Sequence, residues 1–216
     1  MSSFAAQYLQ VPLIYVNQIG ANDNLIFDGN SFILDKNGSK IKQLKSFAEQ
    51  LSSWDSERTE PQENKFEKSE MSSIFDALVL GVKDYAKKCG FKTALIGLSG
   101  GIDSALVAAI ATAALGSNNI YCVSMPSKWS SSHSKSDAKD LARRLKINYD
   151  SIPIANLMST FEESLNKTID TDMAEITNQN IQSRIRGTLL MALANQEKHL
   201  LLSTCLLYTS DAADEV

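Results

Sequence analysis

The sequence predicts an α/β protein with a parallel sheet, and three observations lead to this fold class. Short apolar runs alternate with helix-forming segments over the second part of the chain. The connections between these runs are long enough for right-handed crossover helices. Before residue 60, in contrast, the pattern is that of short β-strands joined by turns. We therefore expect a three-layer parallel-sheet domain that is preceded by a β-rich segment.

The β-rich part contains three apolar runs: PLIYVNQ (12–18), NLIFDG (24–29) and SFILDKNGSKIKQL (31–44). The third run holds Asn37-Gly38 between two apolar halves. This dipeptide predicts a hairpin with a type I′ turn, which needs positive φ at both central residues. The polar and charged stretch 52–70 has few aliphatic residues and is typical of a linker.

The remaining elements alternate between helix and strand. Ser73 and Asp76 resemble a capping box, which predicts that a helix begins near residue 73. Strands are predicted at TALIGL (93–98), IYCVSM (120–125), SIPI (151–154) and HLLLS (199–203), and helices at 104–115, 136–145 and 174–196. In such a sheet the ligand lies off the carboxyl ends of the strands. We therefore expect a site formed by the turn after Leu98, the loop after Met125 and the residues that follow Thr204.

Composition excludes several classes of protein. The chain of 216 residues is 44% hydrophobic, which suits one domain or one domain and part of another. A net charge of −4 argues against nucleic acid and anionic membrane as partners, and no apolar run approaches the roughly 18 residues of a membrane span. Cys89, Cys122 and Cys205 form no CxxC pair, so we expect a reducing cytoplasm. His133 and His199 are too few for a histidine-rich metal site.

The turn GLSGGIDSA is the sharpest chemical signal in the sequence. Gly100 and Gly101 permit backbone conformations in which successive N–H groups converge on an anion. Ser99 and Ser104 offer hydroxyl donors, and the following helix N-terminus adds about half a positive charge. Asp103 would repel a phosphate unless a cation lay between them, and Mg²⁺ held by Asp103 would remove that conflict. The simpler alternative is a helix cap that follows a glycine-rich turn.

The string SGGIDS resembles the pyrophosphate loop of the ATP pyrophosphatase superfamily. Members of that superfamily split ATP into AMP and pyrophosphate while they adenylate an acceptor. The resemblance implies ATP contacts at Gly97, Leu98, Ser99, Gly100, Gly101, Ile102, Asp103 and Ser104.

A wider resemblance is carried by four further segments: YVNQIGANDNLIFDGNSF (15–32), MPS with SSSHS (125–134), QNIQSRIRGTLLMALAN (179–195) and LLST (201–204). In this order they resemble glutamine-dependent NAD synthetase, in which a nitrilase-like glutaminase domain precedes the ATP-pyrophosphatase domain. The resemblance implies a cytoplasmic, homo-oligomeric ligase that uses Mg²⁺ and ATP. Such an enzyme adenylates deamido-NAD with loss of pyrophosphate, and ammonia from glutamine then displaces AMP to give NAD.

The helix predicted at 174–196 carries the candidate residues for the second substrate. Asn180, Arg184 and Thr188 follow one another at a spacing of four along one side of this helix, whereas Arg186 lies on another face with Gln182. A solvated helix face would explain these side chains equally well. The resemblance implies that Asn180 and Arg184 contact deamido-NAD.

Two more residues join the ATP site by resemblance, namely Ser127 and Thr204. The alternative for Ser127 is a loop hydroxyl that bonds its own backbone. Trp129, in the same loop, could stack on a base or pack against the protein, and the sequence does not decide between these roles.

The resemblance also divides the chain. We expect residues 1–60 to be the C-terminal part of the nitrilase-like domain with its linker, and residues 61–204 to be the N-terminal part of the synthetase domain. The glutaminase Glu, Lys and Cys of the family lie upstream of this chain, so we expect an inactive fragment without catalytic residues of its own. After Thr204 the family's GNKSE segment is replaced by CLLYTSDAADEV, and we expect residues 205–216 to be a sequencing-adapter artefact.

Other functions stay open at this point. The chain could belong to another adenylating enzyme of the superfamily, such as a GMP-synthetase-like amidotransferase or a tRNA-modifying enzyme. The latter predicts a basic patch, which the net charge of −4 does not favour. A non-catalytic module that binds nucleotide without turnover is the third reading.

Overall fold

A computed structural model describes residues 1–23, 25–57, 69–168 and 174–204 of the chain. The chain divides into two compact units, Met1–Tyr85 and Ala86–Val216. Linker residues 58–68 and the expected artefact 205–216 lie outside the described residues.

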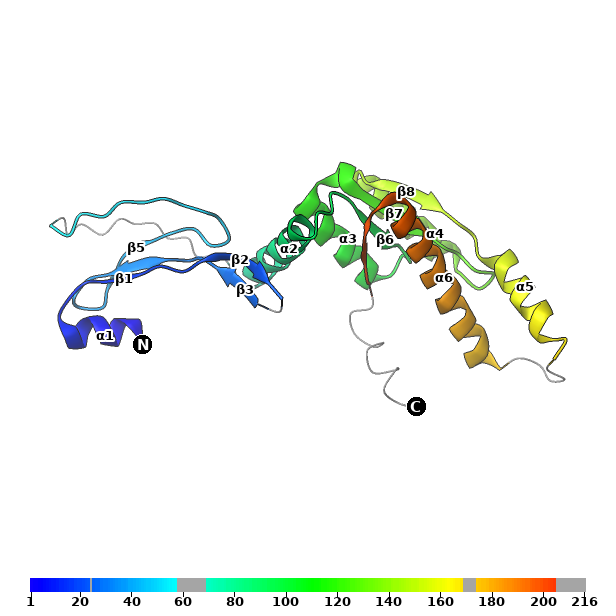
Figure 1. The fold of residues 1–216 in the computed structure, drawn as a ribbon, viewed down its shortest axis with the longest axis horizontal. Coiled ribbons are helices and arrows are strands. Elements are labelled where there is room, and N and C mark those ends of the chain that lie inside the picture. Colours follow the sequence, from blue (N-terminus) through cyan, green and yellow to red (C-terminus); the bar gives the residue numbers. More distant parts are fainter. Residues whose placement is uncertain (24, 58–68, 169–173, 205–216) are drawn as a thin grey trace. The chain divides into compact units, whose positions relative to one another are not determined.

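The first unit is rich in short strands, as the sequence predicts (Figure 1). Its elements are α1 (Ser2–Leu9), β1 (Leu13–Tyr15), β2 (Ile19–Asn22), β3 (Leu25–Asp28), β4 (Phe32–Leu34), β5 (Lys40–Gln43) and most of α2 (Glu70–Lys88). The strands form two antiparallel sheets, β1-β4-β5 and β2-β3. Helix α1 was not predicted from the sequence.

The hairpin expected around Asn37-Gly38 is present, but the type I′ turn is wrong. Strands β4 and β5 pair in antiparallel register, while only Gly38 of the two turn residues has positive φ, at 78°. The Asp35 carboxylate accepts the N–H groups of Asn37 and Ser39, both at 2.8 Å, and Gly38 N–H donates to the Asp35 carbonyl at 3.0 Å. Because the Asp35 side chain organises the turn, one left-handed residue is sufficient.

Helix α2 begins before the expected capping box, which is therefore wrong. The Ser69 hydroxyl accepts the N–H of Ser72 at 3.2 Å, so Ser69 and not Ser73 satisfies the free amides of the first turn. Near the end of the unit, Asp84 accepts the N–H of Ala21 at 2.9 Å. This bond fixes α2 against β2.

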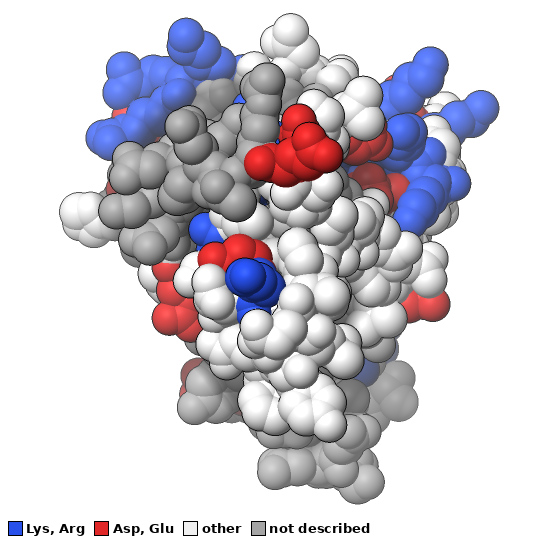
Figure 2. All heavy atoms as spheres, turned by 90° about the vertical axis from the view of Figure 1, so that its left-hand side faces the viewer, with Lys and Arg blue, Asp and Glu red and all other residues white. Residues whose placement is uncertain are grey.

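The first unit buries few apolar side chains. Among the described residues before Ala86, only Ala6 and Leu34 belong to the buried hydrophobic core, while Phe4 and Tyr8 are more than two-thirds exposed. Figure 2 shows Lys, Arg, Asp and Glu side chains in small groups among the other residues of the face it presents. The main hydrophobic core of the described chain therefore lies in the second unit.

The second unit is built on a four-stranded parallel sheet in the order β8 (Asn148–Ser151), β7 (Ile120–Ser124), β6 (Ala94–Gly97), β9 (Leu200–Leu202). This confirms the predicted parallel sheet. The chain moves outward from β6 to β7 and β8, and then returns to pair β9 on the other side of β6. The strand order therefore reverses at β6, and ligands of open α/β sheets bind at the carboxyl ends beside such a reversal.

Helices cover both faces of the sheet (Figure 1). They are α3 (Ile102–Leu115), α4 (Ser132–Leu145), α5 (Ala155–Leu165) and α6 (Glu175–Glu197). Ile96 and Cys122 pack in a cluster with residues of α3 and α4, whereas the neighbouring strand residues Leu95 and Val123 pack with α5 and α6. Alternate strand residues thus belong to two hydrophobic cores, one on each face of the sheet, which confirms the three-layer architecture.

The third strand expected at SIPI (151–154) is wrong. The strand ends at Ser151, and Ile154 is a fully buried residue directly before α5. As an edge strand, β8 presents largely polar and exposed residues, so it lacks the apolar signature of its neighbours. Helix α5 was not predicted because the apolar residues directly before it were assigned to a strand.

A small cluster closes the amino ends of the strands. Thr93 Oγ1 and His199 Nδ1 are hydrogen-bonded at 2.6 Å, and the His199 ring stacks on Tyr121 with 4.5 Å between ring centroids. The three residues stand at or beside the starts of β6, β7 and β9. They lie at the opposite end of the sheet from the carboxyl ends.

Candidate functional site

A cavity of about 780 Å³ lies where β6, β7 and β9 end. Each strand delivers residues to its wall: Ser99 follows β6, Pro126 follows β7 and Thr204 follows β9. Helices α4 and α6 supply further lining side chains. The sequence predicted a ligand site at this place, where the carboxyl ends of the strands lie together.

The glycine-rich loop after β6 is held from within by two serines. Ser104 is 1% exposed, and its hydroxyl donates to the Gly101 carbonyl at 3.0 Å and accepts the Ser99 N–H at 3.3 Å. The Ser99 hydroxyl in turn accepts the Gly101 N–H at 3.1 Å and lies 3.1 Å from Ser104 Oγ. Ser104 therefore shapes the loop, while Ser99 also reaches the cavity wall.

Two glycines, Gly97 at the end of β6 and Gly100 in the loop, shape this part of the site. Gly100 has φ +85°, a conformation that L side chains rarely adopt. A Cβ atom on Gly97 would lie 2.9 Å from the Leu190 side chain, so this glycine lets α6 approach the end of β6. A residue with positive φ, such as Gly100, is a usual part of a backbone nest whose N–H groups bind an anion.

Asp103 stands in the first turn of α3, just after Gly101 and the exposed Ile102. It is half-buried and is not part of the cavity wall. Within the described residues, no group of three or more His, Cys, Asp and Glu side chains could hold a metal. A single carboxylate fits a Mg²⁺ ion whose other ligands are phosphate oxygens and water, as is usual for this ion.

Ser127 is a buried residue of the loop that follows β7. Its hydroxyl accepts the Trp129 N–H at 3.3 Å and lies 3.4 Å from Ser130 Oγ. Trp129 lines the cavity, is 54% exposed, and carries Lys128 Nζ 4.3 Å from its ring centroid. In this structure Ser127 supports the loop, and Trp129 forms part of the wall.

The first turn of α4 also lies beside the cavity. The helix begins at Ser132 rather than near residue 136, because the Ser131 hydroxyl caps it by accepting the Ser134 N–H at 3.0 Å. Ser131, Ser134 and Lys135 all line the cavity. The serine-rich segment is therefore a helix start and not only a loop.

The residues predicted for the second substrate lie elsewhere on α6. Asn180 and Arg184 are exposed, and neither lines the large cavity. Arg184 borders a separate open hollow of about 700 Å³ together with Thr188 and Met191. Gly187 belongs to the walls of both the cavity and this hollow, so the two spaces adjoin at one residue without a side chain.

Arg186 is a cavity residue that the sequence reasoning did not select. Its Nε donates to the Met125 carbonyl at 3.1 Å, and its Nη2 donates to Gln182 Oε1 at 3.4 Å, which confirms the expected pairing with Gln182. Partial burial lowers the pKa of Arg186 below its ordinary value. The spacing of Ser183, Arg186 and Leu190 along one helical face was the available signal.

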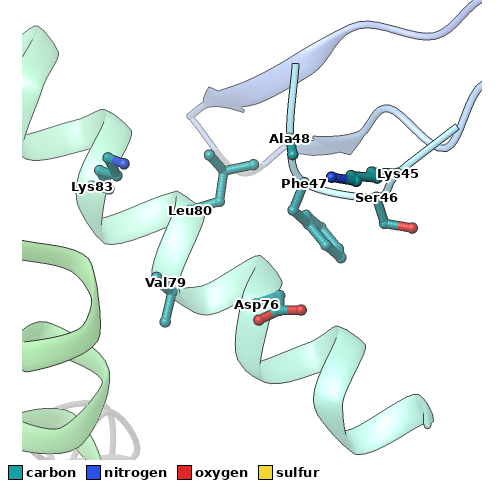
Figure 3. Close-up of a pocket in the computed structure, with 8 residues that line it drawn as sticks. All are labelled: Lys45, Ser46, Phe47, Ala48, Asp76, Val79, Leu80 and Lys83. Carbon is teal, nitrogen blue, oxygen red and sulfur yellow. The ribbon is translucent and has the colours of Figure 1, made fainter. Parts of the chain in front are cut away.

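A second cavity, of about 440 Å³, lies within the first unit (Figure 3). The loop after β5 contributes Phe47, whose ring points toward α2, and Val79 and Leu80 of α2 also line this space. The wall contains no glycine-rich loop that could expose backbone amides to an anion. The first cavity is therefore the stronger candidate for a functional site.

The fold and the site define a class of protein. A buried parallel strand leads into the SGGIDS loop and an α-helix, at the reversal of strand order and beside a cavity. These features define an adenine-nucleotide-binding α/β domain of the ATP-pyrophosphatase type. Within the described residues, no helix has the length and apolar character needed to cross a membrane.

The chain belongs to the NAD synthase family, because the sequence model of this family matches residues 74–207. It is 48% identical over 94% of its length to a glutamine-dependent NAD(+) synthetase of a Synechocystis species, and 41% identical over 90% to one of Rhodobacter capsulatus. It spans 37% and 36% of the length of these two relatives. The family predicted from the sequence is thereby confirmed.

Solved structures agree with this assignment. The glutamine-dependent NAD+ synthetase of Acinetobacter baumannii, in complex with ADP, aligns with a TM-score of 0.91 at 36% identity and covers 98% of this chain and 41% of that one. The NH3-dependent NAD synthetase of Campylobacter jejuni aligns with a TM-score of 0.55 at 27% identity, and covers 62% of this chain and 56% of that one. The second structure covers less of this chain than the first.

Proposed function

We propose that the chain carries the ATP-binding part of a glutamine-dependent NAD synthetase. This enzyme converts deamido-NAD to NAD through an adenylated intermediate, releases AMP and pyrophosphate, and takes its ammonia from glutamine. The observation that carries the proposal is the SGGIDS loop, which opens beside a 780 Å³ cavity in a chain that closely matches a relative in complex with ADP.

In this proposal the loop from Gly97 to Ser104 holds the triphosphate of ATP. Backbone N–H groups of the loop and the amino end of α3 stabilise the charge that develops on the departing pyrophosphate. Mg²⁺ bound at Asp103 would neutralise phosphate charge. Ser104 acts indirectly, because its hydroxyl is used within the loop. Thr204, at the end of β9, contacts the nucleotide from the far wall.

Deamido-NAD would occupy the hollow beside Arg184, with Asn180 as a further contact on the same helix. The two substrates would then meet at Gly187, where the absence of a side chain leaves room for the nicotinate carboxylate to approach ATP. Ser127 would contribute by supporting the loop that carries Trp129. These roles make α6 the wall that separates, and at one point joins, the two substrates.

Cys122 does not suit a glutaminase nucleophile. Burial raises the pKa of the Cys122 thiol to about 12, and Cys89 lies exposed next to the end of α2. A nucleophilic cysteine needs a readily formed thiolate. We infer that glutamine is hydrolysed by a residue other than Cys122, and that the enzyme works in the cytoplasm as a homo-oligomer without nucleic acid.

The test is ATP–pyrophosphate exchange in a chimera in which residues 1–204 replace the matching segment of the Synechocystis relative. Exchange that depends on deamido-NAD and is lost in Asp103→Asn is the expected result. Exchange that depends on another acceptor would favour a GMP-synthetase-like or tRNA-modifying enzyme. Nucleotide binding without any exchange would favour the non-catalytic module.

A further inference from the structure

The wall of the large cavity carries positive charge without a matching negative charge. Among the described lining residues, Lys135 and Arg186 are the charged ones, and no Asp or Glu is present. A cavity with two cations and no carboxylate attracts anions, since fields are focused in a partly enclosed space.

Arg186 is held in a fixed position on this wall. Its Nε–H is bonded to the carbonyl of Met125 at the exit of β7, and Nη2 is bonded to Gln182 within α6. A guanidinium has five N–H donors, so these two bonds leave others for a ligand. The tether to Met125 thus orients a planar donor group at the cavity while α6 carries it.

Lys135 approaches from a different helix. It is exposed in the first turns of α4, and its backbone N–H bonds Ser131. Neither Lys135 nor Arg186 forms an ion pair with any carboxylate in the described part of the chain. For Arg186 this matters most, because a partly buried cation without a counter-charge is costly and gains strongly from an anionic ligand.

We propose that Arg186 and Lys135 are substrate-binding residues that grip phosphate oxygens in this cavity. The inference rests on the proposed function, which it deepens. The phosphates could belong to ATP or to the pyrophosphate bridge of deamido-NAD, and the chemistry of recognition is the same for both. Arg186 supplies fixed, directional hydrogen bonds, and Lys135 supplies a mobile point charge.

The experiment measures KM for ATP and for deamido-NAD in the chimera and in its Arg186→Met and Lys135→Met variants. Each variant should raise one of the two KM values by about tenfold or more, as expected when a charge-assisted hydrogen bond is lost. A rise for ATP assigns the residue to the triphosphate, and a rise for deamido-NAD assigns it to the dinucleotide. Arg186→Lys should recover part of the loss, because it keeps the charge but not the fork of donors.

Matched controls are Arg143→Met and Lys139→Met, which alter exposed side chains of α4 that do not line the cavity. Unchanged KM values in both test variants would overturn the proposal. A fall in kcat with a lower melting temperature and no KM change would also overturn it, since Arg186 would then be a structural tether only. If Arg186→Met does not fold, Lys135→Met carries the test, because its side chain is exposed.

Binding of inorganic pyrophosphate separates this proposal from the proposed function. Calorimetric titration of the 216-residue chain should show pyrophosphate binding that weakens by about tenfold or more in the double variant Arg186→Met/Lys135→Met. That result would support the two residues even if the chimera showed no exchange with deamido-NAD. Absence of pyrophosphate binding to the unmodified chain, or binding that is undiminished in the double variant, would refute their role whatever the exchange assay gives.

Discussion

The backbone of Ser134 lies directly against Gly100. A Cβ atom added to Gly100 would stand 2.9 Å from the Cα atom of Ser134, and closer still to its carbonyl oxygen. The first turn of α4 therefore packs on the glycine-rich loop at Gly100, which has no side chain. Backbone on both sides of this contact cannot move aside as a flexible side chain could.

Gly100→Ala should therefore be severely destabilising. The positive φ and the backbone clash together should lower the free energy of unfolding by about 3 kcal/mol or more. The matched control is Gly90→Ala, where φ is also positive, at +78°, but a Cβ atom would meet nothing within 4 Å. It should cost only about 1 kcal/mol. Urea unfolding measures both values, and equal losses would show that the contact with Ser134 is unimportant.

Ser104→Ala should weaken the loop without touching a ligand. The change removes the hydroxyl that bonds the Gly101 carbonyl and the Ser99 N–H in a buried position. We expect a loss of about 1–3 kcal/mol in the free energy of unfolding. Ser136→Ala, which removes an exposed hydroxyl bonded to the His133 carbonyl, is the control and should change little. A loss no greater than that of the control would contradict the supporting role of Ser104.

Gly187 offers a substitution that should separate stability from activity. Gly187→Ala should stabilise the chain by about 0.5–1 kcal/mol, because glycine is a poor helix former and the added Cβ meets nothing within 4 Å. Gly187→Phe should instead fill the junction of the two hollows and lower the rate of deamido-NAD-dependent exchange in the chimera by tenfold or more, on the order of 1.4 kcal/mol. Melting temperature and exchange rate, measured together, decide the point. Full activity in Gly187→Phe would exclude a meeting of substrates at this residue.

Cys122 should make the chain less stable at alkaline pH. Burial raises the pKa of its thiol from 9.0 to about 12, so the folded state keeps the proton while the unfolded state releases it above pH 9. The contribution of Cys122 to stability is thus complete below pH 9 and declines as pH rises toward 12, by about 1.4 kcal/mol per pH unit. Cys122→Ala should lack this component, which comparison of unfolding free energies at pH 8 and pH 10 would reveal. Parallel pH profiles for the two proteins would contradict it.

The core of the fold was predictable because its signals are local. Residues 94–97 and 120–124 are short, buried and apolar, and the glycine-rich loop between one of these strands and its helix has a characteristic pattern. The edge strand β8 was missed because its residues are polar, and the apolar SIPI run took its place. Periodicity cannot distinguish a strand from a buried approach to a helix over four residues.

The site was only partly predictable for a different reason. Ser99 and Thr204 follow strands, so sheet topology alone brings them to the cavity. Whether Arg184 or Arg186 faces the cavity depends on the rotation of α6 about its axis, and the sequence does not fix this rotation because the apolar residues of α6 are not gathered on one face. Lys135 was hidden because helix α4 begins four residues earlier than expected.

The cluster of Thr93, Tyr121 and His199 stabilises the end of the sheet that lies opposite the candidate site. All three side chains fasten the strands at the amino ends, while every residue assigned to chemistry lies at or beyond the carboxyl ends. Substitutions that raise thermal stability can therefore occur at the amino ends of the strands, while substitutions that alter substrate preference occur at the carboxyl ends. Because all strands of a parallel sheet run in the same direction, the residues that stabilise the sheet and the residues of the site lie at opposite ends.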